Sequence, residues 1–200
     1  MRILWIIIFT TTLLWSAINP KDQLTWFLEV APALIGAAIL ALTWKKYPLT
    51  PMLYVLILIH CLILMVGGHY TYAEVPLFDR ISGLFGWQRN NYDKVGHLAQ
   101  GFIPAIIARE IIIRAKAVNG YRWLNLFVIS VCLAFSAFYE LIEWWVAELS
   151  GESAVAFLGT QGYVWDTQSD MFMALLGACF ALLFLSRWHD RQLQQMSIET

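Results

Sequence analysis

Long apolar stretches occupy almost the whole chain, and the links between them are short and either polar or rich in glycine and proline. A helix needs about 20 apolar residues to cross the hydrocarbon core of a bilayer. Six stretches come close to that length, at approximately 3–18, 26–44, 50–72, 93–114, 124–148 and 168–187. The pattern predicts an all-α, polytopic bundle of about six transmembrane helices, which forms one integral membrane domain over residues 1–200.

The composition favours lipid over water as the solvent. Hydrophobic side chains make up 60% of the 200 residues and charged side chains only 14%, which is too few for the surface of a water-soluble domain. The net charge is −1 and no Lys/Arg-rich tract occurs, so we expect no nucleic-acid partner. Cys61, Cys132 and Cys179 each lie inside an apolar stretch and form no CxxC pair, which is typical of small core residues rather than of disulfides.

The first apolar stretch has some features of a signal peptide. Arg2 is followed by a largely apolar run to Ile18, but Trp15 stands where small residues should precede a cleavage site. The stretch also lacks an A-x-A pattern. We therefore expect a first membrane helix that is retained.

The distribution of basic residues predicts the orientation of the bundle, because Lys and Arg accumulate in short cytoplasmic loops. With the N-terminus in the cytoplasm, nine of the thirteen basic residues fall on the cytoplasmic side: Arg2, Lys45, Lys46, Arg109, Arg114, Lys116, Arg122, Arg187 and Arg191. Both termini are therefore predicted to face the cytoplasm. Below, "inner" denotes this side of the bundle and "outer" the opposite side.

A segment between the third and fourth stretches has the pattern of a short amphipathic helix. After Pro76, apolar residues recur at helical spacing, at Leu77, Phe78, Ile81, Leu84 and Phe85. Such a helix lies in the membrane interface, and Trp87 and Tyr92 are typical of headgroup depth. The segment could anchor the loop on the outer surface or act as a lid through which a lipid enters.

Ionisable side chains inside membrane spans are costly, so each one is a candidate functional residue. In the fourth stretch, Asp93, His97 and Gln100 lie at positions i, i+4 and i+7, which places them on one stripe of the helix. Gly96 and Gly101 leave space beside this stripe for another backbone.

Further acids belong to the same outer layer. Glu140 and Glu143 share one face in the outer half of the fifth stretch. After a loop from Gly151 to Val164, Asp166 and Asp170 lie one turn apart at the start of the sixth stretch. Two more polar residues fall at this depth in the third and second stretches: His69 and Glu29. Five helices can thus present polar groups to one layer.

This mixture of imidazole and carboxylate groups is the one used by divalent-metal sites inside helical bundles. A bound cation would also allow several acids to share a space of low polarity. We therefore expect a divalent metal ion as cofactor, with these ligands: His97, Glu140, Glu143, Asp93, Asp166 and Asp170. Gln100 and Tyr139 are expected to hold the ligands in place.

Structural roles explain some of the acids equally well. Asp93, and Asp166 or Asp170, can cap the starts of their helices or pair with basic residues nearby, namely Lys94, Arg89 and Arg80. Such explanations fit Glu140, Glu143 and His97 least well, because the two glutamates lie below the interface with no basic residue near them in sequence. These three residues are the candidates for catalysis.

The remaining polar residues in the spans favour structural interpretations. His69 is expected at the interface rather than on a metal, and His60 as a hydrogen-bonded contact between helices. Glu110 and Arg114 form an i, i+4 pair at the cytoplasmic end, which needs no function.

Three segments together resemble a known family: YDKVGHLAQGFIPAIIARE (Tyr92 to Glu110), YELIEWW (Tyr139 to Trp145) and WDTQSDM (Trp165 to Met171). Over essentially its whole length the chain resembles the YjdF-type bacterial inner-membrane proteins. The resemblance implies a location in a bacterial inner membrane, and since the family is a domain of unknown function it assigns no role to any residue. The run from Asp93 to His97 is also similar to VanZ-like membrane proteins, over a single helix.

Three functions remain open. The first is a metal-dependent membrane enzyme acting on a lipid-type substrate at the periplasmic face, where the metal polarises an oxygen or activates water. The second is a small proton- or cation-coupled transporter, which would need a route to the cytoplasm in a half of the bundle that offers only His60, Glu110 and Arg109. The third is a structural or regulatory membrane partner. Membrane lipids are expected as partners, with a lipid or a small ion as substrate.

Overall fold

Helices form all the regular structure in the computed structural model, which describes residues 2–150 and 160–198. The helices in these ranges are α1 (Arg2–Ala17), α2 (Gln23–Thr43), α3 (Pro51–His69), α4 (Pro76–Phe85), α5 (Tyr92–Arg114), α6 (Tyr121–Ser150) and α8 (Asp166–Ile198). The described ranges contain no strand, so the predicted all-α class is confirmed. Of the predicted loop from Gly151 to Val164, residues 151–159 lie outside the described part.

Five helices, α2, α3, α5, α6 and α8, are long and apolar enough to cross a membrane, which confirms a polytopic bundle. The sixth predicted span, α1, has only 16 residues. Its N-terminal Arg2 lies over the Trp44 ring, 4.1 Å from the ring centre, at the inner end of α2. At its other end the carbonyl of Ser16 accepts a hydrogen bond from His69 Nδ1 at 3.0 Å, at the outer end of α3. α1 therefore has nearly the same extent as its neighbours, and the six-span topology and its orientation stay predictions.

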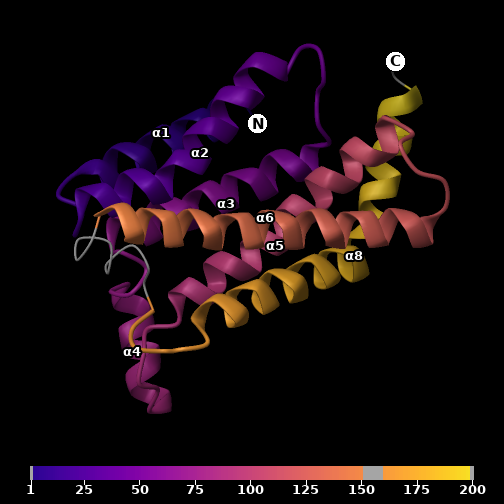
Figure 1. Cartoon of the computed structure of the whole chain (residues 1–200). Helices are drawn as coiled ribbons and strands as arrows, with labels where there is room; N and C mark the ends of the chain where they lie inside the picture. Colours follow the sequence, from indigo (N-terminus) through magenta and orange to yellow (C-terminus); the bar gives the residue numbers. More distant parts are fainter. Residues whose placement is uncertain (1, 151–159, 199–200) are drawn as a thin grey trace.

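The long helices form a bundle in which α5 is the most deeply buried. Figure 1 shows α1, α2 and α3 on one side of α5 and α8 on the other, with α6 running across both. The tightest contact joins α5 and α8, because a Cβ at Gly101 would overlap the carbonyl of Ala174 and one at Gly177 would overlap that of Leu98. Small residues allow such close approach of membrane helices. The space predicted beside Gly101 is thus filled by the backbone of α8.

The amphipathic segment forms a helix, α4, at the predicted place. Figure 1 shows it at one end of the bundle, running across the direction of the long helices. Leu77, Leu84 and Phe85 are exposed along it, as an interfacial helix requires, and Trp87 is exposed next to it. Tyr92 differs from this expectation, because its side chain is buried and its hydroxyl donates to the carbonyl of Ile63 at 3.0 Å.

A buried polar network closes the inner end of the bundle. The carboxylate of Glu110 accepts hydrogen bonds from the Thr50 hydroxyl at 2.9 Å, from Arg114 at 2.9 Å and from His189 Nε2 at 3.0 Å. Arg109 donates to His189 Nδ1 at 2.9 Å and to Asp190 at 2.7 Å. Because an arginine can only donate, Nδ1 of His189 must accept, which leaves the ring neutral with its proton on Nε2.

The expected pair of Glu110 and Arg114 is therefore part of a larger arrangement that involves α8. The sixth stretch was expected to end near residue 187, but α8 continues to Ile198, about three further turns. Its polar residues beyond the apolar stretch still find buried partners, since Gln192 also accepts a hydrogen bond from the backbone N–H of Met52 at 3.0 Å. Polar contacts rather than lipid hold this end of α8 in place.

The glycine contact between α5 and α8 gives a first prediction. Gly101→Ala places a methyl group where the Ala174 carbonyl lies, so the helices must move apart at a cost of about 1–3 kcal/mol. We expect a clearly lower midpoint of thermal unfolding in detergent. Gly36→Ala in α2 is the control, because a Cβ there meets no atom within 4 Å and should leave the midpoint unchanged or raise it. Equal midpoints for the two variants would contradict the contact.

The inner network gives a second prediction. Glu110→Leu removes the common acceptor of Thr50, Arg114 and His189, and breaking a buried pair from one side costs about 3–5 kcal/mol. Denaturation in mixed micelles should show this loss. Lys21→Ala serves as the control, because Lys21 pairs with Glu74 at 3.0 Å with both side chains more than half exposed, and exposed pairs contribute only about 0–1 kcal/mol. A loss no larger than that of the control would show that the network does not hold the helices together.

Candidate functional site

Two basic residues tie three aspartates together at the outer end of α5 and α8. Arg89, which precedes α5, donates to Asp166 at 2.6 Å and to Asp93 at 3.3 Å. Lys94 donates to Asp166 at 2.7 Å and to Asp170 at 2.6 Å. All five side chains are at most 15% exposed. The pairing of Arg89 and Lys94 with the acids is therefore as expected, whereas Asp93 does not cap α5, whose N-cap is Asn91.

His97 lies at the centre of this layer and has polar neighbours on both ring nitrogens. Nε2 is 3.2 Å from Asp93 Oδ1, one turn earlier on α5, and 3.8 Å from Asp170 Oδ1 on α8. Nδ1 is 2.9 Å from Gln100 Oε1 and 3.9 Å from Glu140 Oε1. A proton on Nδ1, donated to Gln100, would leave the lone pair of Nε2 directed toward the two aspartates.

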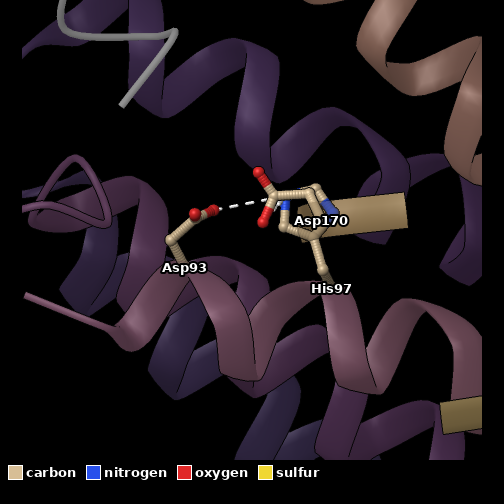
Figure 2. A group of neighbouring side chains, drawn as sticks. All are labelled: Asp93, His97 and Asp170. Atoms are coloured by element: carbon tan, nitrogen blue, oxygen red, sulfur yellow. Dashed lines mark ion pairs between the residues drawn. The ribbon is translucent and has the colours of Figure 1, made fainter. Parts of the chain in front are cut away.

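Asp93, His97 and Asp170 form a triad of side chains, in the described residues, that could hold a metal ion. One ligand atom from each lies within 4.8 Å of the others. Figure 2 shows the carboxylates of Asp93 and Asp170 and the imidazole of His97 turned toward one another, with Asp93 and His97 on the same helix. His97 and Asp170 are buried, and Asp93 is half-buried. Such a set of one imidazole and two carboxylates suits a divalent transition metal.

Three glutamates complete what we call the outer polar layer: Glu29, Arg89, Asp93, Lys94, His97, Glu140, Glu143, Asp166 and Asp170. Glu29 on α2 accepts a hydrogen bond from the Tyr139 hydroxyl on α6 at 2.9 Å. Glu140 is 8% exposed, and its buried Oε1 has no hydrogen-bond partner. Glu143 makes no hydrogen bond or ion pair with any described residue. In this layer six carboxylates therefore face two permanent cations and one histidine.

A cavity of about 580 Å³ begins at the outer polar layer and continues between the helices. Its polar end contains Glu29, Asp93, His97, Gln100, Glu143 and Asp170. Further along, apolar side chains of α5 and α6 line it, among them Ile107, Ile111 and Phe135. Phe135 is 61% exposed and Phe138, also on the wall, 52% exposed, so the cavity opens sideways, toward the predicted lipid.

Tyr72, in the loop after α3, closes the polar end of the cavity. Its ring occupies the space left by two glycines, Gly67 on α3 and Gly96 on α5, since a Cβ on either would overlap the ring. Gly96 was expected to admit another backbone, and the side chain of Tyr72 takes that place. Burial, reinforced by the charge of Glu29, raises the pKa of Tyr72 well above its usual value, so this phenol stays neutral and can donate a hydrogen bond.

The structure does not bring every predicted residue to the triad. Asp166 pairs with Arg89 and Lys94 instead, and Glu143 lies on the cavity wall. His69 lies apart, hydrogen-bonded to α1 and packed on Trp15, which is consistent with the interface. The interpretation of His60 as a hydrogen-bonded contact is wrong: the ring has no hydrogen bond to a described residue and lies on the cavity wall.

Sequence reasoning missed two features at the site. Tyr72 falls in the predicted third span, but its ring fills the space beside Gly67 and Gly96, and these two glycines were the available signal. His189 and Asp190 at the inner end were overlooked because they follow the apolar stretch. The adjacent pair Arg109 and Glu110 inside a span was the available signal, since two fully buried charges need partners.

Known proteins agree with the membrane architecture and with the resemblance noted in the sequence. Residues 1–191 match the family described as "Predicted membrane protein (DUF2238)". The inner membrane protein YjdF of Escherichia coli (strain K12) is 51% identical over 191 residues, which cover 96% of this chain and 91% of that protein. No solved structure matches. The chain therefore belongs to the DUF2238 family and is a multi-pass protein of the bacterial inner membrane.

Proposed function

We propose that this protein is a metal-dependent membrane enzyme that acts on a lipid-type substrate at the periplasmic face. The observation that carries the proposal is the buried triad of Asp93, His97 and Asp170 at the polar end of a cavity that opens to the lipid. Binding pockets of enzymes are commonly apolar and hold a few convergent polar groups in this way.

The site supports a metal ion for three reasons. Three protein ligands from two rigid helices leave coordination positions open for water or substrate, as in catalytic metal sites. Gln100 Oε1 at 2.9 Å from His97 Nδ1 is the kind of second partner that orients a ligating histidine. The unpartnered Oε1 of Glu140 behind His97 is a further acceptor in need of a positive or hydrogen-bearing group.

Lys94 limits how the metal can bind. Its ammonium group donates at 2.6 Å to Asp170 Oδ1, the oxygen that lies 3.8 Å from His97 Nε2. A metal ion would have to share this oxygen with Lys94 or displace it. The other acceptor of Lys94, Asp166, is already paired with Arg89. Competition between the ammonium group and the metal is therefore expected to lower the affinity for the metal and to make it depend on the charge of residue 94.

The chain's own residues have definite tasks in the proposed reaction. The metal, when bound, would polarise a substrate oxygen or activate a water. Glu143, on the cavity wall and with no partner among the described residues, would take up or deliver a proton at the substrate, and Glu29 with Tyr139 would bind its polar group. The apolar wall of α5 and α6 would hold the hydrocarbon part.

Metal analysis tests the proposal directly. Protein purified in detergent under Zn²⁺- and Mn²⁺-replete conditions should carry about one ion per chain, and His97→Ala and Asp170→Asn should lose most of it because each removes one of three ligands. Asp166→Asn is the matched control: it lies in the same layer but only in the ion pairs with Arg89 and Lys94, so its metal content should persist.

The reaction itself is tested by incubating the protein with an extract of inner-membrane lipids. Mass spectrometry should detect a change in one lipid class that needs both the metal and Glu143, and that disappears in Glu143→Gln while the metal content does not. A wild-type protein that binds no stoichiometric metal, or a lipid conversion that survives Asp93→Asn and His97→Ala, would refute the enzyme as described.

A second cavity supports a transporter as the alternative. It measures about 380 Å³, shares the walls at Pro32, His60 and Ile107 with the first cavity, and extends to Thr43 and Tyr47 near the inner end. His60 thus lies between an outer and an inner space, as a residue on an ion route would. Proton or cation flux in liposomes that is lost in His60→Leu would favour the carrier over the enzyme.

A further inference from the structure

The cavity has one polar end and a long apolar part, which is the shape of an amphiphile rather than of a small ion. Along α5 its wall extends from Asp93 to Ile112, which corresponds to about 28 Å of helix and nearly the thickness of the hydrocarbon core. Beyond Gln100 the α5 wall is apolar, formed by residues such as Pro104, Ala108 and Ile111. A long hydrocarbon chain fits such a wall, and a hydrated ion does not need it.

The entrance to the cavity is on the side of the bundle. α2 and α6 both line it, yet they make no extended contact with each other within the described part of the chain. The wall residues Phe135 and Phe138 of α6 and Ile111 of α5 are about half exposed or more. Because these exposed groups are apolar, and Phe135 and Phe138 lie in the middle of α6, a ligand would reach the cavity from the bilayer rather than from water.

The polar end selects the charge of the ligand's head. Its acidic members are Glu29, Asp93, Glu143 and Asp170, and no described Lys or Arg lines the cavity. Arg89 and Lys94, which neutralise the aspartates, do so from outside it. A phosphate or carboxylate head would meet four acidic side chains and only one basic group, His97, whereas an amine or a hydroxyl would find several acceptors.

We infer that this cavity binds a long-chain amphiphile whose head is not anionic and donates hydrogen bonds, with an amine preferred over a hydroxyl. The amphiphile enters from the bilayer between α2 and α6. The inference rests on the proposed function, since it names the substrate class of the same site. It does not depend on a bound metal, because the acids that select the head face the cavity with or without one.

Native mass spectrometry of the full chain tests the head group, with the metal removed by chelator so that a phosphate cannot bind through it. Octadecylamine, octadecanol and octadecyl phosphate are the probes. We expect the amine to bind most tightly and the phosphate at least about tenfold more weakly. The double variant Glu29→Gln, Glu143→Gln should reduce the difference between amine and phosphate. Phosphate binding equal to or tighter than that of the amine would overturn the assignment of the head.

A second set of variants tests the apolar part. Ala108→Trp fills the inner part of the apolar wall and should weaken octadecylamine binding at least about tenfold while affecting octylamine much less, because the shorter chain ends before that point. Leu183→Trp on the exposed side of α8, outside the cavity wall, is the control and should bind as the wild type does.

Two outcomes keep this inference separate from the metal site. Ala108→Trp with normal metal content and unchanged octadecylamine binding would overturn the cavity as the binding site and leave the metal proposal intact. Conversely, wild-type protein that binds no stoichiometric metal but still prefers octadecylamine would support the amphiphile site while refuting only the metal chemistry.

Discussion

The structure depends on the close contact between the backbones of α5 and α8 at Gly101 and Gly177. With no side chain at the crossing, the two parallel helices approach until carbonyl groups take the places of Cβ atoms. This contact fixes the register of both helices along their whole lengths. One turn toward the outer side it sets His97 against Asp170, and at the inner end it sets Arg109 and Glu110 against His189. Both polar networks are consequences of one packing contact.

The two networks differ in how they balance charge. At the inner end Arg109 and Arg114 are matched by Glu110 and Asp190, and His189 is held neutral between an obligate donor and a carboxylate. In the outer polar layer two cations face six carboxylates. A buried uncompensated charge costs several kcal/mol, so the inner network is complete as a structural device whereas the outer layer needs protons or a bound cation.

Much of the architecture could be predicted from the sequence because a bilayer imposes strict lengths and polarity on a helix. Apolar length located every long helix, and helical spacing located α4 and put Asp93 and His97 on one face. Depth alone placed Glu29, Glu140 and Asp170 in one layer. Sequence could not say which acid faces which helix, because that depends on the rotation of each helix about its axis. Asp166 and Asp170, one turn apart, both accept from Lys94, but only Asp166 also pairs with Arg89 and only Asp170 joins the triad.

The ends of the helices and the loops were less predictable for a different reason. Apolar length reports where lipid ends, but α8 continues past that point because its polar residues are buried by protein, as His189 is by Arg109 and Glu110. Tyr72 likewise enters the bundle from a loop, through a slot that Gly67 and Gly96 leave open. In both places a contact between segments distant in sequence replaces lipid. The hydropathy of a segment does not indicate such contacts.

The positions of Arg89 and Lys94 explain why the carboxylates of the outer polar layer outnumber the cations on only one side of α5. Arg89 and Lys94 lie with Asp166, on the side of α8, and neutralise the aspartates from there. The cavity lies on the other side, between α5 and the pair α2 and α6, where its wall includes Glu29 and Glu143 but no described Lys or Arg. Walls of low dielectric focus the field of these acids into the cavity instead of letting water screen it. The outer polar layer is therefore polarised across α5: its salt-bridged face lies toward α8, and its acidic face lines the cavity.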